Sequence, residues 1–97
     1  MLPAQRVSTH PGEILRDQFL KPMGLTQVDL ADHVGVSVQR INEIVRGKRG
    51  VTAETAWLLS QALGTSPEFW VNLQTAHDLT RSTPRTRIRR LAAAASR

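Results

Sequence analysis

The 97-residue sequence contains no cysteine and no tyrosine, and only 4% of its residues are aromatic. The lack of cysteine excludes disulfide bonds and thiolate metal sites. Its three histidines, His10, His33 and His77, are far apart in the sequence and do not have the spacing of metal ligands. No nucleophile motif surrounds a serine or a histidine. We therefore expect no metal, no cofactor, no small-molecule ligand and no enzymatic site.

Long apolar stretches are also missing. No apolar run approaches the ~20 residues of a membrane-spanning helix, and residues 1–9 lack the apolar core of a secretion signal. We therefore expect a cytoplasmic protein with no membrane partner. A chain of this length has room for one small domain, and dimerisation would help to stabilise a domain of that size.

Acidic residues are absent from the C-terminal end. Six of the 13 basic residues are arginines beyond Leu79, where the sequence contains no Asp or Glu. Seven basic and eight acidic residues remain in the rest of the chain, which is nearly neutral although the formal net charge is +5. The sequence thus predicts a folded domain over residues 10–80, a basic and flexible tail over residues 81–97, and an N-terminal arm over residues 1–9, which carry no periodic pattern.

Residues 25–47 predict two short helices joined by a tight turn. Thr26 and Ser37 are suitable N-cap residues, because a hydroxyl can accept from the first helical turn. Gly35 stands where the chain must become left-handed to leave the first of these helices. Apolar residues recur at helical spacing in both: Val28, Ala31 and Val34 flanked by Leu30, then Val38, Ile41 and Val45. The outer face of the second helix is rich in amides and arginine, as in a DNA-reading helix-turn-helix.

Three further helices are predicted around this motif, over residues 13–20, 53–63 and 67–79. Pro22 and Gly24 are expected to stop the first of them. Thr52 and Ser66 are expected to cap the other two. No useful length of the chain alternates with period two, so the sequence predicts an all-α fold of five helices around one core. Trp57 and Trp70 are expected to lie in that core.

The predicted helix-turn-helix resembles that of the phage-repressor-like (XRE) family. The shared pattern, T-Q-x-x-L-A-x-x-x-G-V-S-x-x-x-I, is carried by Thr26, Gln27, Leu30, Ala31, Gly35, Val36, Ser37 and Ile41. Residues 10–15, 47–50 and 64–70 are similar to segments of the HigA-type antitoxins of bacterial toxin–antitoxin pairs. The resemblance implies a lambda-repressor-like fold and a homodimer that binds double-stranded operator DNA with an inverted repeat. It also implies repression of its own operon and neutralisation of a RelE/HigB-like ribonuclease, a HigB-type toxin.

The resemblance places the base contacts on the second helix of the motif, at Ser37, Val38, Gln39 and Glu43, with Arg40 and Asn42 alongside. Glutamine can bond adenine twice, arginine can bond guanine twice, and glutamate can accept from cytosine. Val38 could touch a thymine methyl or pack inward, and Glu43 could instead pair with Arg40 or Arg46. DNA-backbone contacts are expected from Thr26, Gln27, Arg46, Lys48 and Arg49, although Gln27 could also be an ordinary exposed residue.

Two other surfaces are candidates for protein partners. Trp57 and Leu63 are expected to face the core, so Leu58 points partly outward and could form a dimer surface with Phe69 and Leu73. Glu13 and Asp17 lie one turn apart on an exposed helix face. They could meet a cationic toxin, although such a face is more often simply solvated.

Two alternative functions remain open from the sequence. One is a stand-alone XRE-type repressor without a toxin partner. The other is a protein-interaction adaptor that has lost DNA binding, against which the polar face formed by Gln27, Gln39 and Arg40 argues. The arginine-rich tail is a poor candidate for covering a ribonuclease that is itself basic.

Overall fold

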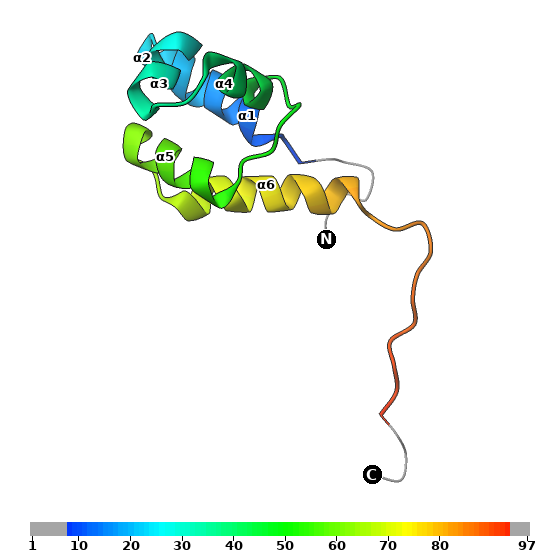
Figure 1. The fold of residues 1–97 in the computed structure, drawn as a ribbon. Helices are drawn as coiled ribbons and strands as arrows, with labels where there is room; N and C mark the ends of the chain where they lie inside the picture. Colours follow the sequence, from blue (N-terminus) through cyan, green and yellow to red (C-terminus); the bar gives the residue numbers. More distant parts are fainter. Residues whose placement is uncertain (1–7, 94–97) are drawn as a thin grey trace.

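The structure, a computed structural model, describes residues 8–93, which contain helices and no strand (Figure 1). The elements in chain order are α1 (Pro11–Ile14), the π-helical segment η1 (Leu15–Leu20), α2 (Lys21–Met23), α3 (Gln27–Val34), α4 (Val38–Val45), α5 (Ala53–Leu63) and α6 (Pro67–Arg81). The first three are consecutive and form one N-terminal helical run, residues 11–23. Five helices therefore result, and the predicted all-α fold is confirmed.

The N-terminal helical run is longer than predicted at both ends. It begins at Pro11 because the Nδ1 of His10 accepts a hydrogen bond from Gly12 N–H at 2.9 Å and caps the first turn. The prediction that Pro22 stops it is wrong. In η1 the Lys21 N–H reaches back five residues to a carbonyl, and this wider turn relieves the clash between a proline ring and the preceding turn. The run ends at Gly24, whose φ of 66° is left-handed.

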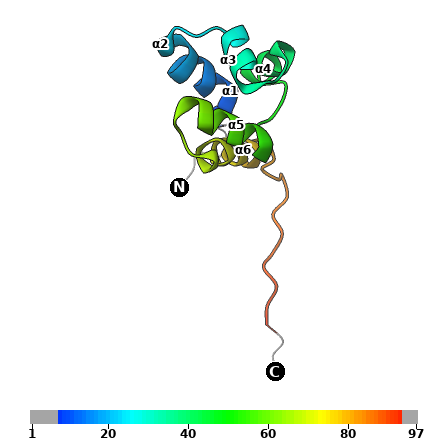
Figure 2. The same ribbon diagram turned by 60° about the vertical axis from the view of Figure 1, so that its left-hand side comes forward.

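The core forms where the N-terminal helical run, α3 and α4 meet the pair α5 and α6 (Figure 2). Trp70 is fully buried at its centre, and its indole N–H donates to Thr65 Oγ1 at 2.7 Å. Phe19 and Phe69 pack around it, with ring centroids 5.3 and 5.0 Å from that of Trp70. Trp70 was predicted to be a core residue, which is confirmed.

The prediction that Trp57 faces the core is wrong, since 57% of this residue is exposed. The buried side of α5 carries Thr55, Ala56, Leu59 and Ser60, most of them small residues that let α5 approach α6. One residue is about 100° around a helix, so Trp57 projects outward from that stripe. Val28 is also exposed, and Leu30 beside it is buried instead.

The two ends of the described chain differ. Ser8 is attached to α6, because its N–H donates to Thr80 Oγ1 at 3.0 Å and its carbonyl accepts from His77 Nδ1 at 2.7 Å. At the other end, residues 83–93 form neither helix nor strand and extend away from α6 (Figure 1). Most of the predicted arm, residues 1–7, and the last four residues of the predicted tail lie outside the described residues. No helix in the described part of the chain has the length and apolarity needed to span a membrane.

Candidate nucleic-acid interface

The α3–turn–α4 unit is fixed by capping hydrogen bonds at both helix starts. Thr26 Oγ1 accepts from Asp29 N–H at 3.0 Å while Asp29 Oδ2 accepts from Thr26 N–H at 2.9 Å, a reciprocal capping box. The hydrogen bond that the carboxylate accepts from the Thr26 N–H is the main reason that the pKa of the Asp29 carboxyl is lowered. Gly35 makes the turn with a φ of 80°, and Ser37 Oγ accepts from Arg40 N–H at 3.1 Å to start α4. The predicted caps and turn are confirmed.

The outer face of α4 begins with three exposed residues. Ser37, Val38 and Gln39 are all accessible, whereas Ile41, Ile44 and Val45 are buried against the core. Val38 is 45% exposed, so the structure agrees with the outward of its two predicted orientations. A hydroxyl, a small apolar group and an amide at the first turn of a helix are suited to the edges of base pairs.

The other three residues predicted to contact bases have intramolecular partners. Arg40 Nη2 donates to Glu54 Oε1 at 3.0 Å and to Thr55 Oγ1 at 2.7 Å, which ties α4 to the first turn of α5. Asn42 Nδ2 donates to Gln27 Oε1 at 3.1 Å, which ties α4 to the start of α3. Gln27 is therefore not merely an exposed residue of the first turn. Sequence reasoning missed both pairs because each joins residues that only the tertiary fold brings together.

Glu43 pairs with Arg49, not with the predicted Arg40 or Arg46. Arg49 Nε and Nη2 lie 2.9 and 2.8 Å from Glu43 Oε1. The cause is the turn after α4, where Gly47 has a φ of 76° and the N–H groups of Lys48 and Arg49 both donate to the Glu43 carbonyl. The loop folds back over the end of α4 and brings Arg49 to the carboxylate.

The loop after α4, residues 46–50, also presents cations without a carboxylate partner. Arg46 and Lys48 are exposed, and neither forms an ion pair within residues 8–93. Basic side chains next to an exposed helix face have the arrangement needed to hold phosphates on either side of a groove. The geometry of α4 and this loop is therefore that of a candidate DNA-binding face.

A pair of histidines links the N-terminal helical run to α6. The rings of His10 and His77 lie edge to face with centroids 4.8 Å apart, and they join the start of α1 to α6. Burial, and then the neighbouring His77, lower the pKa of His10. No group of three metal ligands occurs in residues 8–93. The pairing was not predicted because the two residues are distant in sequence and histidine is not a common N-cap.

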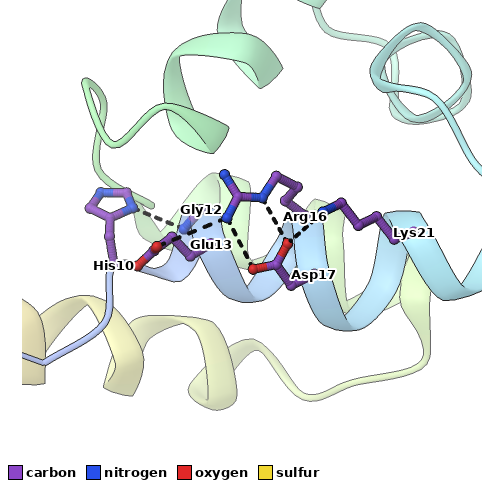
Figure 3. Close-up of polar contacts among 6 residues, drawn as sticks. All are labelled: His10, Gly12, Glu13, Arg16, Asp17 and Lys21. Atoms are coloured by element: carbon purple, nitrogen blue, oxygen red, sulfur yellow. Dashed lines mark hydrogen bonds and ion pairs between the residues drawn. The ribbon is translucent and has the colours of Figure 1, made fainter.

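The two carboxylates proposed for a toxin contact are exposed but are not free (Figure 3). Arg16 lies between them, with Nε 2.8 Å from Asp17 Oδ1 and Nη2 3.9 Å from Glu13 Oε1. Lys21 Nζ is 3.4 Å from the same oxygen of Asp17. The hydrogen bond from Arg16 is the main reason that the pKa of Asp17 is lowered to about 2. This surface therefore carries two acids and two bases, and its charge is balanced.

The three residues predicted for a dimer surface have different surroundings. Leu58 is half-buried and borders a shallow pocket with His33 and Val34 of α3. Phe69 packs on the Trp70 ring, and Leu73 packs against the core. Trp57 of α5, which was not among the predicted residues, is more exposed than Phe69.

Trp57 lines a groove of about 210 Å³ with Ala53 of α5 and with Pro67 and Val71 of α6. Sequence reasoning did not find this groove, because it assigned Trp57 to the core.

Comparisons with known proteins agree with this geometry. The helix-turn-helix family matches residues 17–70, which is more than half of the chain. Over 70 residues the chain is 56% identical to virulence-associated protein I of Dichelobacter nodosus, an alignment that covers 72% of this chain and 65% of that protein. Over 69 residues it is 46% identical to antitoxin HigA-1 of Vibrio cholerae serotype O1, covering 70% of this chain and 64% of that one. The chain thus spans slightly less than two thirds of the length of these two relatives.

A solved structure of antitoxin GraA in complex with its operator is similar over nearly the whole chain. The TM-score is 0.83 at 41% sequence identity, and the match covers 96% of this chain and 100% of that one. With the family match over residues 17–70 and these relatives, the chain belongs to the XRE-type helix-turn-helix family and has HigA antitoxins among its homologues.

Proposed function

We propose that this chain is a sequence-specific DNA-binding antitoxin of the cytoplasm, which represses its own operon and neutralises a RelE/HigB-like ribonuclease toxin by binding and without catalysis. The proposal rests on the exposed residues at the start of α4, which lie next to the loop after this helix. In that loop Arg46 and Lys48 are exposed and have no carboxylate partner within residues 8–93. The Vibrio cholerae relative is named an antitoxin, which supports the toxin-neutralising half of the role. The GraA structure contains its operator, which supports the DNA-binding half.

In this proposal α4 enters the major groove and reads base edges. Ser37, Val38 and Gln39 are accessible as they stand, whereas Arg40, Asn42 and Glu43 each have one side-chain atom engaged by an intramolecular partner. The DNA backbone is held at both ends of the motif, by hydrogen-bonding residues at the start of α3 and by cations of the loop after α4. These residues are Thr26, Gln27, Arg46, Lys48 and Arg49.

Specific binding calls for two copies of this small motif. In a symmetric dimer the two α4 helices would lie about 34 Å apart, one helical turn of DNA, and would read an inverted repeat. We place the dimer surface on α5 and α6, where Leu58, Phe69 and Leu73 lie and where the exposed Trp57 adds an apolar ring of the kind enriched at interfaces. Sedimentation should show a dimer at micromolar concentration, and a monomer both free and on inverted-repeat DNA would rule it out.

The DNA-binding half is tested by titrating the protein against its own upstream DNA and a scrambled duplex. Gln39→Ala should reduce discrimination between the two by about 1–3 kcal/mol, the range for one good bidentate base contact, with no loss of folding. Gln18→Ala is the matched control, because Gln18 is an exposed glutamine on η1, away from α4. Unchanged discrimination by Gln39→Ala would remove α4 from the groove.

The toxin half is tested by co-purification with the product of the reading frame beside this gene, and by suppression of its messenger cleavage. A Glu13→Lys, Asp17→Lys double variant changes the balanced surface into a strongly cationic one, which should repel a basic toxin. No co-purification with the wild type would favour a stand-alone XRE-type repressor. Undiminished binding by the double variant would place the toxin contact on another surface.

A further inference from the structure

The C-terminal segment 82–93 is basic, and within residues 8–93 its only hydrogen bonds to the folded domain are those of Ser82 and Thr83 to carbonyls of α6. Every residue in it is exposed, including Ile88 and Leu91, each 92% accessible. Arg85, Arg87, Arg89 and Arg90 form no ion pair within residues 8–93, and the segment contains no acidic residue. Four cations are thus held in twelve residues without an internal partner, so the segment is available to an external polyanion.

The segment follows α6, and α6 is linked through His10 to the loop after α4. His77, one turn before the end of α6, packs against His10 at 4.8 Å, and the His10 ring lies 3.8 Å from a Cβ built on Gly47. One turn earlier, Gln74 Oε1 accepts from Val51 N–H at 2.8 Å. Both views show the segment leaving α6 at this end of the molecule (Figures 1 and 2). The C-terminal half of α6, which carries the segment, is therefore linked to the loop after α4 through His10 and Gln74.

The extended segment can reach far from its point of attachment to α6. Twelve extended residues span up to about 40 Å at ~3.3 Å each, and a DNA duplex offers about one phosphate per 1.7 Å of axis. In an extended chain, Arg85, Arg87 and Arg89 lie on one side of the backbone. The segment points away from α4 in this structure, but it is joined to the domain only through residues 82–84, and no packing holds it there (Figure 1).

We infer that residues 82–93 form a DNA-binding arm that contacts the phosphates of duplex DNA flanking the operator. This inference rests on the proposed function, since the operator fixes the domain that carries the arm. A basic toxin is excluded as the main partner by like charge. The arm adds affinity that does not depend on sequence, whereas α4 supplies the discrimination.

The test uses the full chain and a variant in which Arg85, Arg87, Arg89 and Arg90 are all changed to Gln. Affinity is measured against salt concentration for an operator duplex with flanks and for one trimmed to the operator. Each phosphate neutralised adds about 0.9 to the slope of log K against log salt, so four arginines add up to about 3.6. Between 50 and 200 mM salt, wild-type affinity for the flanked duplex should then fall about 10²-fold more than that of the variant. On the trimmed duplex the two proteins should bind nearly alike.

Two controls separate the charge of the arm from its side-chain shape and from the stability of the domain. The same four residues changed to Lys retain the charge and should retain the steep slope. Thermal unfolding of the Gln variant should match the wild type, because all four arginines are exposed and form no ion pair within residues 8–93.

Four results would overturn the proposed DNA-binding arm: a wild-type slope in the Gln variant, a Lys variant as shallow as the Gln variant, loss of folding, or an equal slope change on the flanked and the trimmed duplex. Failure of the wild type to prefer operator over scrambled DNA would instead refute the proposed function.

Discussion

Changing Glu54 to Gln is expected to strengthen operator binding by releasing Arg40. In the free protein the Arg40 guanidinium donates to Glu54 Oε1 at 3.0 Å and to Thr55 Oγ1 at 2.7 Å. A bidentate bond to guanine that uses Nη2 would have to replace these two contacts. Operator binding therefore includes the free-energy cost of breaking this pair. Weakening the pair in the free protein should lower that cost and raise the affinity for the operator.

The size of the gain follows from the exposure of the pair. The Glu54 side chain is 75% exposed and that of Arg40 is 26% exposed, so solvent screens the pair and its value is about 0.2–1 kcal/mol. Glutamine at position 54 still offers a neutral acceptor, which keeps the gain below the whole of that range. Affinity should rise no more than about fivefold, since 1.4 kcal/mol corresponds to a factor of ten.

Removing a carboxylate near DNA also reduces repulsion from phosphates, so the single variant is ambiguous by itself. A double-mutant cycle with Arg40→Ala separates the two causes. A gain that acts through Arg40 disappears when Arg40 is alanine, whereas a gain from reduced repulsion persists. The measurement is a fluorescence anisotropy titration of the four proteins on operator DNA at one salt concentration, with thermal unfolding measured in parallel.

An equal gain in both backgrounds would refute the reasoning. Arg40 would then keep its contacts with α5 in the complex and would act as a brace between α4 and α5. In that case Arg40→Ala should lower the free energy of unfolding and leave discrimination between operator and scrambled DNA unchanged.

Three further predictions concern the fold that supports the interface. Gly12→Ala should lower the free energy of unfolding by about 3 kcal/mol, because its Cβ would lie 1.8 Å from a backbone carbonyl oxygen of α4. Gly24→Ala, whose Cβ meets nothing within 4 Å, should lose only about 1 kcal/mol through its left-handed backbone. Because burial lowers the pKa of His10 from 6.5, the unfolded chain binds more protons near that pH. Stability should therefore fall as pH drops below 6.5, and His10→Asn, which keeps a capping oxygen, should flatten this dependence. Trp70→Ala should cost about 3–5 kcal/mol, and Trp57→Ala less than about 1 kcal/mol when the chain is monomeric.

Urea unfolding between pH 5 and 8 checks all three predictions. Equal losses for the two glycine variants would contradict the close approach of α1 to α4. A pH dependence that survives His10→Asn would belong to another titrating group. Equal losses for the two tryptophan variants would contradict the outward position of Trp57.

Local signals in the sequence predicted the helix boundaries well. The hydroxyls of Thr26 and Ser37 act on N–H groups within three residues, so the cap and its acceptor are visible together in the sequence. Gly35 is recognisable for the same reason, because its left-handed backbone is a property of one residue. Where the local signal was unusual, at the His10 cap and at Pro22 after a π-helical turn, the predicted boundary of the N-terminal helical run was wrong.

Orientation within a helix was less predictable than its ends. Two apolar stripes can be drawn on α5, one through Trp57 and one through Ala56 and Leu59, and hydrophobicity favours the stripe with the larger ring. The structure selects the other stripe, because small residues allow the close approach of α6. The contact between His10 and His77 could not be predicted at all, since it depends on where α6 ends relative to α1.

The pairs on the DNA-binding side determine how specificity can arise. Three hydrogen-bonded pairs lie on this side: Gln27 with Asn42, Arg40 with Glu54, and Glu43 with Arg49. Each pair satisfies polar groups that bases or phosphates would otherwise satisfy. The correct bases must therefore replace existing hydrogen bonds of the protein. A wrong base leaves a protein group with neither its intramolecular partner nor a base, and this costs more free energy than a missing contact alone. Such exchange adds little affinity but penalises mismatches. On this reasoning, most of the affinity comes from Lys48, Arg46 and the arm over residues 82–93, whose charges have no partner to give up within residues 8–93, and most of the discrimination comes from α4.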